Sequence, residues 1–382
     1  MREGGVNLHV YGSTFQYEAR VFRVVVALGS IHLFDKIIMM GLRYNNILPS
    51  EQRFDDSSVI WRVNAIQDRS GWFSKVLSKL LFSWRVIRRL RGVKIKVVTC
   101  HSLSDLPTCC ALKFLKRAKL VYDAHELETE TVCSVGLRRV LARIVERVLI
   151  KYVDSTIVVS DSIFHWYKVK YSLKQLHIVR NIPDKVKVAH SDVVDLKKIF
   201  SIPREHILFI YQGVIDAERG VDRLLRLFSR ASNDHHIVFL GFGGAVKRVK
   251  QFSSKHPNIH IHDAVSSKDL LRYTAGADVG IHLIPNNCIN HDYCLPNKFF
   301  QYISMGLPVL VSNVKEMGGI VNHYNCGWVL SSGVETNDID FINRISQKSV
   351  SFMKKGCVNC SEAFSWEKEK TVLVDVYKRL LL

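Results

Sequence analysis

The sequence predicts an α/β protein made of two doubly wound parallel sheets, and three observations support this fold class. Short apolar runs alternate along the chain with segments of helical periodicity. Several of these runs are continuous, as expected for parallel strands that are covered on both faces. The length of 382 residues is large for one core and fits two domains of ordinary size. A break around 181–183, followed by a polar stretch up to Pro203, separates two such series.

The first half contains apolar runs that we interpret as strands. They lie at 6–11, 36–41, 59–63, 95–100, 119–123, 155–160 and 176–180. Helical patterns lie between them, most clearly at 72–90 and 134–152. We therefore expect residues 1–182 to form an N-terminal Rossmann-like domain.

The second half repeats this alternation. Its expected strands lie at 207–213, 236–241, 259–263, 278–284, 308–312 and 327–330. We expect residues 183–361 to form a second Rossmann-like domain, and a C-terminal helix within 362–382 to pack back on the first. Ligands of such sheets bind outside the carboxyl ends of the strands, so two domains facing across a cleft would bind a ligand between them.

The segment YCLPNKFFQYISMGLP at 293–308 carries the clearest functional signal. A polar loop leads to Pro296, which we expect at the first helical position, where proline is favoured. The first amides of a helix lack backbone partners and point outward, so this helix start is a natural anion site. Lys298 in the first turn opposes the helix dipole, which is unfavourable unless an anion binds there. A surface lysine on an ordinary connection is the alternative.

This segment resembles the PNK-F-x-Y variant of the donor-site motif of family 4 glycosyltransferases, which are retaining enzymes of the GT-B fold. Further segments resemble that family in the same order along nearly the whole chain. They are VYDAHELETE at 121–130, VVS at 158–160, VRNIP at 179–183, YQGVIDAERGVDRLL at 211–225, VFLGFGG at 238–244, ADVGIHLIP at 277–285 and FSWEKEKTVLVDVYKRLL near the C-terminus. The resemblance implies transfer of a sugar from a nucleoside diphosphate, retention of configuration and no obligatory metal.

The resemblance also assigns donor-binding residues to the second half. Arg219 stands where the family has a basic residue that contacts the donor diphosphate, and an arginine can bind two phosphate oxygens at once. The arginine that usually follows the strand glycine is Val214 here, which leaves the diphosphate to Arg219, Lys298 and helix amides. The further donor-binding candidates are Gly213, Gly243, Val265, Pro296, Asn297, Gln301 and Glu316.

The chain departs from the family at its pair of glutamates, which fall on Tyr293 and Gln301. Gln301 can still hydrogen-bond to ribose hydroxyls, but it brings no charge. We therefore expect ribose binding to be weaker than in the family. Glu316 is a spare carboxylate near this position, and its alternative role is that of a helix N-terminal charge.

In the N-terminal domain, which the resemblance places on the acceptor side, His125 follows the strand LVYDAH, at the place of the family histidine that binds the donor sugar. His125, Arg219 and Lys298 are the candidate catalytic residues. A neutral imidazole can donate a hydrogen bond there without adding charge; a histidine that only closes a strand is the alternative. Glu126 is a candidate for contacting acceptor hydroxyls. Glu18 and Arg20 follow a Gly12-Ser-Thr loop and are acceptor-side candidates, although this loop lacks the family's double glycine.

Composition favours a reduced cytoplasmic protein. The nine cysteines show no framework spacing, and Cys357-Val-Asn-Cys360 is a lone CxxC without a second pair. The N-terminus lacks the long apolar stretch of a secretory signal, and no run approaches the roughly 20 apolar residues of a membrane helix. No carboxylate pair is placed to hold a divalent ion, so we expect neither a metal nor another cofactor.

Charge is a second signal. The net charge is +19, and residues 1–182 contribute 29 basic and 15 acidic residues, a net of +14. The segment 71–96 holds eight basic residues and no acid, with Trp72, Phe73 and Trp84 among leucines. Such a helix can lie in the headgroups of an anionic membrane; a helix with a solvated basic face is the alternative. No recognisable nucleic-acid module accompanies the charge, so we expect no nucleic-acid partner.

The resulting hypothesis is a cytoplasmic glycosyltransferase, peripheral on the inner face of the cell membrane, that acts in surface polysaccharide synthesis. It would move a sugar from a nucleotide-sugar donor to a glycan or lipid-linked acceptor. Two other classes stay open. One is a catalytically weakened partner subunit, suggested by Val214 and Gln301. The other is a sugar-nucleotide epimerase, whose expected carboxylate cluster is not evident.

Overall fold

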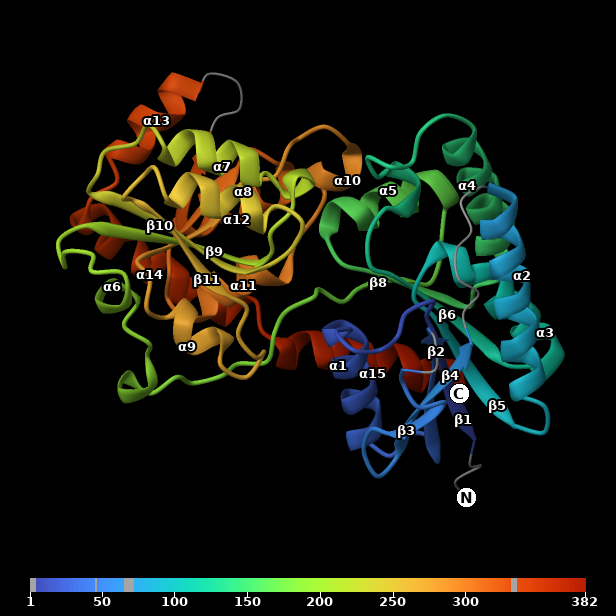
Figure 1. Cartoon of the computed structure of the whole chain (residues 1–382). Helices are drawn as coiled ribbons and strands as arrows, with labels where there is room; N and C mark the ends of the chain where they lie inside the picture. Colours follow the sequence, from blue (N-terminus) through green and yellow to red (C-terminus); the bar gives the residue numbers. More distant parts are fainter. Residues whose placement is uncertain (1–4, 45–46, 65–71, 331–334) are drawn as a thin grey trace. The chain divides into compact units, whose positions relative to one another are not determined.

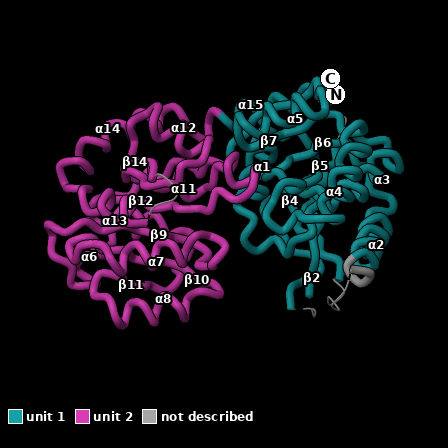
Figure 2. Tube along the Cα trace, turned by 90° about the horizontal axis from the view of Figure 1, so that it is seen from above, with its two compact units in different colours: residues 1–180, 369–382 teal, residues 181–368 magenta. Residues whose placement is uncertain are grey.

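The computed structural model describes residues 5–44, 47–64, 72–330 and 335–382, with the backbone alone for 72–75. The chain divides into two compact units, residues 1–180 with 369–382, and residues 181–368 (Figure 2). The chain therefore leaves the first unit after residue 180, where the sequence suggests 182. It returns to that unit at residue 369, where the sequence suggests 362.

The first unit contains an eight-stranded sheet in the order β3-β4-β2-β1-β5-β6-β7-β8. Its strands are β1 (Val6–Val10), β2 (Lys36–Arg43), β3 (Glu51–Arg53), β4 (Ser58–Asn64), β5 (Ile95–Cys100), β6 (Lys119–Ala124), β7 (Ser155–Val158) and β8 (Leu176–Ile178). All pairs are parallel except β3 with β4. The predicted strands are confirmed. Sequence reasoning missed β3 because its three exposed residues pair at the sheet edge and give no apolar signal.

Six α-helices cover this sheet in the described part of the unit. They are α1 (Ala19–Ser30), α2 (Trp72–Arg89), α3 (Leu106–Lys116), α4 (Gly136–Leu149), α5 (Asp161–Tyr171) and α15 (Trp366–Leu381), the last of which begins in the second unit. Helix α3 packs against both α2 and α4, since the Ser83 hydroxyl lies 2.6 Å from that of Thr108 and α3 also contacts α4 (Figure 1). Helix α15 closes the unit by burying Tyr377, whose hydroxyl lies 2.8 Å from Thr99 Oγ1.

The second unit contains a six-stranded parallel sheet in the order β11-β10-β9-β12-β13-β14. Its strands are β9 (Ile207–Val214), β10 (His235–Phe242), β11 (Ile259–Asp263), β12 (Val279–His282), β13 (Val309–Ser312) and β14 (Gly327–Leu330). Alternate residues of β9 enter different cores, Phe209 and Tyr211 on one face and Leu208 and Ile210 on the other. This explains why the strand sequence is continuously apolar. The prediction of two doubly wound sheets is confirmed.

The helices of the second unit are mostly short. They are α6 (Leu196–Ile199), α7 (Val221–Phe228), α8 (Val246–Ser253), α9 (Leu270–Thr274), α10 (Ile289–Asp292), α11 (Asn297–Ser304), α12 (Lys315–Tyr324), α13 (Glu335–Asn343) and α14 (Gln347–Ala363). Among the described residues of both units, no helix combines the length and apolarity that crossing a membrane requires.

Three histidines form a row across neighbouring strands of the second sheet. His206 Nδ1 lies 3.0 Å from His236 Nε2, and His236 Nδ1 lies 3.0 Å from His260 Nε2, with the rings stacked or close to it. A neutral imidazole offers one donor and one acceptor, so three uncharged rings can form both hydrogen bonds of this row. Burial lowers the pKa of both His236 and His260 to about 4.

We predict that this row makes the fold acid-sensitive. The unfolded chain protonates His236 and His260 near pH 6.5, whereas the folded chain protonates these two rings only near pH 4, so the free energy of unfolding falls as the pH is lowered through this window. Each ring should contribute roughly 2–3 kcal/mol to that fall. A His260→Phe variant, whose ring can still pack on Phe200, should show a shallower dependence. Urea unfolding at a series of pH values measures this, and equal slopes for the two proteins would contradict it.

Candidate functional site

Five strand ends of the second unit hold the predicted donor-binding residues. Because β9 to β13 are parallel, their carboxyl ends lie along one edge of the sheet. Gly213 belongs to the end of β9, and Gly243 follows β10. Val265 follows β11, the strand at one margin of the sheet, and it is half-buried. Glu316 is buried in the first turn of α12, after β13.

The loop after β9 places Arg219 at this edge. Arg219 ends a single 3₁₀ turn, Ala217–Arg219, and it is exposed. Gly220 follows with a φ of 79°, and a Cβ there would lie 1.8 Å from the carbonyl oxygen of Leu283. Only glycine allows this left-handed turn to approach the end of β12 so closely. The Glu-Arg-Gly sequence thus fixes the position of Arg219 through its glycine.

The polar loop before α11 ends one residue later than the sequence suggests. Pro296 is the N-cap of α11 rather than its first helical residue, because its ψ of 150° is extended and helical geometry begins at Asn297. The carbonyl of Pro296 accepts a hydrogen bond from the amide of Phe299 at 3.1 Å. Asn297 and Lys298 remain in the first turn, as predicted. Asn297 Oδ1 is buried without a hydrogen-bond partner among the described residues.

Lys298 is an unpaired cation at this site. Its Nζ is buried and finds no hydrogen-bond acceptor in the part of the chain that the structure describes, although the residue as a whole is partly exposed. Nζ lies 4.2 Å from the centre of the Tyr211 ring and 3.8 Å from the place that a Cβ would take on Gly213. Burial, and then the charge of Arg219, lower the pKa of Lys298 to about 7. The structure therefore brings Gly213, Arg219 and Lys298 together.

Sequence reasoning missed His282 at the end of β12. This residue is buried, and its Nδ1 has no hydrogen-bond partner among the described residues. Burial holds its pKa well below the usual range, and the charges of Lys298 and Arg219 lower it further. His282 is therefore a neutral neighbour of the two cations. A polar residue at the carboxyl end of the apolar run ADVGIHLIP was the signal that could have identified it.

Gln301 is held in one orientation by its neighbours. Gln212 Nε2 donates to Gln301 Oε1 at 2.8 Å, and Thr274 Oγ1 donates to Gln212 Oε1 at 2.7 Å. Since Oε1 is engaged, the group that Gln301 can offer to a ligand is its NH₂ donor.

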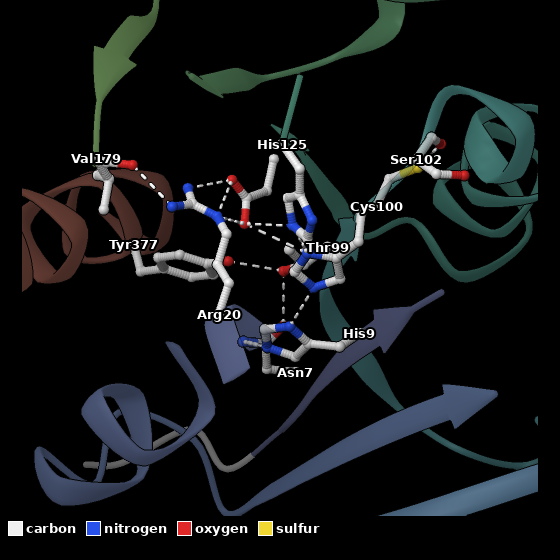
Figure 3. Close-up of polar contacts among 11 residues, drawn as sticks. Asn7, His9, Arg20, Thr99, Cys100, Ser102, His125, Val179 and Tyr377 are labelled. Atoms are coloured by element: carbon white, nitrogen blue, oxygen red, sulfur yellow. Dashed lines mark hydrogen bonds and ion pairs between the residues drawn. The ribbon is translucent and has the colours of Figure 1, made fainter. Parts of the chain in front are cut away.

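Two candidates of the first unit, His125 and Arg20, lie close together (Figure 3), and both contact Asp123. His125 follows β6, and its Nε2 lies 3.3 Å from Asp123 Oδ2 and 3.1 Å from His101 Nδ1. Arg20 is buried, and it donates to both oxygens of Asp123 and to the carbonyl of Val179. The structure thus gives Arg20 an internal role, in contrast to the predicted contact with an acceptor.

The other two acceptor-side candidates flank this cluster in the sequence. The hydroxyl of Ser13 donates to a carboxylate oxygen of Glu18, which orders the loop before α1. Glu126 is exposed directly after His125. Glu128 accepts a hydrogen bond from the amide of Leu103 at 2.5 Å, yet burial raises the pKa of Glu128 to about 8. A carboxyl that is protonated near neutral pH can donate as well as accept.

One group among the described residues could hold a metal ion. Ligand atoms of His101, Asp123 and His125 all lie within 4.8 Å of one another. Arg20 already binds this carboxylate, with Nη2 2.6 Å from Oδ1. A divalent ion there would lie beside a guanidinium, which makes the arrangement more typical of an internal ion pair.

Comparisons with known proteins agree with this geometry. Residues 205–347 match the family model described as "Glycosyl transferases group 1", and no curated protein matches the chain. Among solved structures, sucrose-phosphate synthase from Thermosynechococcus elongatus has 13% identity, a TM-score of 0.81 and 99% coverage of both chains. Anabaena HepE in complex with UDP-glucose has 12% identity and a TM-score of 0.73, over 98% of this chain and 99% of that chain.

A third similar structure is WaaG, a glycosyltransferase involved in lipopolysaccharide biosynthesis. It has 12% identity and a TM-score of 0.66, over 97% of this chain and 99% of the other. At these identities the structural matches establish the fold, and the family model matches part of the second unit. The chain has the GT-B fold, and its residues 205–347 are similar to group 1 glycosyltransferases.

Proposed function

We propose that this enzyme transfers a sugar from a nucleoside-diphosphate sugar to a glycan or lipid-linked acceptor, as a retaining, metal-independent member of family 4. The observation that carries the proposal is the buried Nζ of Lys298, which has no acceptor among the described residues and feels the charge of Arg219. Two cations held near each other favour a doubly charged anion. A donor diphosphate is such an anion, and similar structures contain UDP and UDP-glucose.

Each residue of the site would act on a defined part of the donor. Arg219 and Lys298 would stabilise the diphosphate as it gains charge on leaving the sugar. Gly213, with a φ of 104°, has no side chain that would stand between the backbone and Lys298. A phosphate could therefore approach the end of β9. Gln301 would donate to a ribose hydroxyl. The leaving phosphate would take the acceptor's proton, with attack on the same face, and we propose no protein nucleophile.

A catalytically weakened partner subunit is the competing function. It is favoured by Val214, which replaces a cation, and by the uncharged Gln301. Binding and turnover separate the two: a panel of UDP-, GDP- and dTDP-sugars, screened by thermal shift and then for transfer or hydrolysis, should identify a donor that is turned over. A donor that binds without turnover would favour the partner subunit.

The acceptor side of the proposal is a surface polysaccharide or glycolipid at the cytoplasmic face of an anionic membrane. Helix α4 of the first unit supports this. Leu137, Val140, Leu141, Ile144 and Val148 are all exposed, and their spacing places them on one face of the helix. Exposed Arg138 and Arg147 lie on the same helix. An exposed apolar face with arginines beside it suits the headgroup region of an anionic bilayer.

Helix α2, the segment for which sequence analysis suggests membrane contact, offers fewer free charges. Arg85 donates to the carbonyl of Asn64, and Arg89 donates to those of Arg62 and Ser50. Leu77, Leu80 and Trp84 are nevertheless exposed. The side chains of Trp72 and Phe73 lie outside the described residues. We therefore assign the principal membrane contact to α4, with α2 as a secondary one.

We predict that Lys298→Met reduces activity while it increases stability. Loss of a charged hydrogen bond to the diphosphate should lower kcat/KM on the identified donor roughly 10- to 150-fold, that is by about 1.5–3 kcal/mol. The pKa of Lys298 is about 7 in the folded chain, against the usual 10.5. At neutral pH the amine is therefore protonated more readily in the unfolded chain, which lowers the free energy of unfolding. Methionine should raise the free energy of unfolding by roughly 2–4 kcal/mol.

The matched control is Lys315→Met, because Lys315 also starts a helix and lies 5.3 Å above a tyrosine ring but is exposed. It should leave both kcat/KM and stability near wild type. Unchanged kcat/KM in Lys298→Met would remove Lys298 from the donor site.

We also predict that donor affinity falls as the pH rises above about 7. Lys298 is charged below its pKa of about 7 and neutral above it, while the diphosphate of a nucleotide-sugar stays ionised, so Kd should increase up to roughly tenfold per pH unit. In Lys298→Arg the charge persists, and the affinity should be independent of pH. Titration calorimetry with the donor between pH 7 and about 9 tests this. A wild-type affinity that does not change with pH would contradict it.

The membrane proposal predicts that Leu137→Glu with Ile144→Glu abolishes binding to vesicles of phosphatidylglycerol and phosphatidylcholine at low salt. The two charges would enter the face that the bilayer covers, whereas donor binding in the second unit should persist. Phe352→Glu replaces an equally exposed apolar residue of α14 and should leave co-sedimentation unchanged. Wild-type protein that ignores these vesicles would contradict the proposal.

A further inference from the structure

A cavity of about 210 Å³ lies at the amino-terminal edge of the first sheet, beside the last turns of α15. Lys119 and Ser155, the first residues of β6 and β7, line it together with Arg379 of α15. Because β6 and β7 are parallel, this edge is opposite to the one at which His125 follows β6. The cavity is therefore separate from the candidate site of this unit.

The size of the cavity limits what it can hold. At roughly 30 Å³ for each water molecule, it has room for about seven waters. Drug-sized ligands occupy pockets of roughly 300–1,000 Å³. The cavity therefore suits a small metabolite and is too small for a nucleotide-sugar.

The strand residues that line the cavity share one face of the sheet. Thr99 on β5 contacts Tyr377 of α15, and the strand register leads from Thr99 across β6 to Ser155. Residues in register point to the same face, and alternate residues of one strand do so too. Lys119 and His177 therefore lie on this face as well. The cavity is enclosed between these side chains and α15.

Three basic side chains border the cavity without being paired. Lys119 and Arg379 are exposed, His177 is half-buried, and none of the three forms a side-chain hydrogen bond or ion pair with a described residue. Burial, and then the charge of Arg379, lower the pKa of His177. At neutral pH this ring is uncharged, and it can still donate one hydrogen bond. The cavity thus offers two full positive charges and a neutral donor.

The carboxylate at the cavity does not balance these charges. Asp154 lines the cavity, but its Oδ2 lies 2.5 Å from Nζ of Lys113 and accepts from the amide of Leu120 at 2.7 Å. Lys113 does not line the cavity. The negative charge of Asp154 is therefore already matched by a lysine outside it.

Ser155 adds a hydroxyl that lacks a partner. The residue is buried, and its Oγ forms no hydrogen bond with any described residue. Buried hydroxyls in native proteins are nearly always hydrogen-bonded to protein, water or ligand. An oxygen atom bound in the cavity would be such a partner.

We propose that this cavity binds a small phosphomonoester, with Lys119 and Arg379 holding its phosphate. A phosphomonoester carries close to two negative charges at neutral pH, which matches the two cations. The hydroxyl of Ser155 and the ring of His177 donate to further phosphate oxygens. The oxygen of Asp154 that Lys113 does not engage can accept from a hydroxyl of the ligand. A bound ligand would fasten α15 to the edge of the first sheet.

Titration calorimetry of the full chain with glycerol 3-phosphate, at neutral pH and constant ionic strength, tests this site. Lys119→Gln with Arg379→Gln should weaken binding at least about tenfold, because two charged contacts are lost. Lys378→Gln is the matched control, since Lys378 is exposed beside Arg379 but does not line the cavity. It should bind as the wild type does. Glycerol, which lacks the phosphate, should not bind. Circular dichroism checks that each variant is folded.

The cations of the donor site could attract the same phosphate, so Lys298→Met is titrated as well. It should keep the binding that the double variant loses. A loss in Lys298→Met with unchanged binding in the double variant would place the phosphate in the donor site and overturn the proposal. Wild-type protein that does not bind glycerol 3-phosphate would overturn it too. None of these measurements requires turnover, so their outcome is independent of the proposed function.

Hydrogen exchange locates the bound phosphate. Glycerol 3-phosphate should slow exchange in α15 and around the first residues of β7 and β8 in the wild type, and should leave these segments unchanged in the double variant. Slower exchange confined to α11 and to the loop after β9 would contradict the proposal.

Discussion

Covering a parallel sheet on both faces favours apolar side chains within its strands and leaves the strand ends for polar groups, and the functional geometry of both units follows from this constraint. In the second unit, residues 207–211 alternate between two apolar cores, and polarity first appears at Gln212 and Gly213. In the first unit, Asp123 near the end of β6 is followed by His125. Because these strands are parallel, their carboxyl ends place the polar side chains at a single edge of each sheet.

The buried cation of each unit has different partners. Arg20 in the first unit meets the Asp123 carboxylate and a backbone carbonyl, so it is satisfied within the fold. Lys298 in the second unit meets the face of Tyr211 and the field of Arg219 instead. A satisfied ion pair orients its neighbours, as Asp123 orients His101 and His125. An unsatisfied cation costs stability until an anion binds, which is typical of a site shaped by function.

Packing also decides which charged and which apolar side chains remain exposed on the surface. The net charge of +14 in residues 1–182 is distributed over several helices, but arginines such as Arg85 and Arg89 are used to hold backbone carbonyls. Helix α4 keeps its apolar face exposed, because Arg139 and Arg143 fold back onto buried Glu130. Local charge density alone therefore does not single out α4; the direction of its side chains does.

Sequence by itself determined the alternation of strands and helices, because continuous apolar runs and helical periodicity report burial directly. It missed β3, whose Glu-Gln-Arg sequence has no apolar residue to bury, and it placed Pro296 one position inside α11. It also identified Lys298 and Arg219 as neighbours at one site. Only the tertiary structure decided that Nζ of Lys298 is buried beside Tyr211, that His282 joins this site, and that Arg20 binds Asp123 and so is already committed. These facts depend on contacts between residues far apart in the chain, which no local pattern encodes.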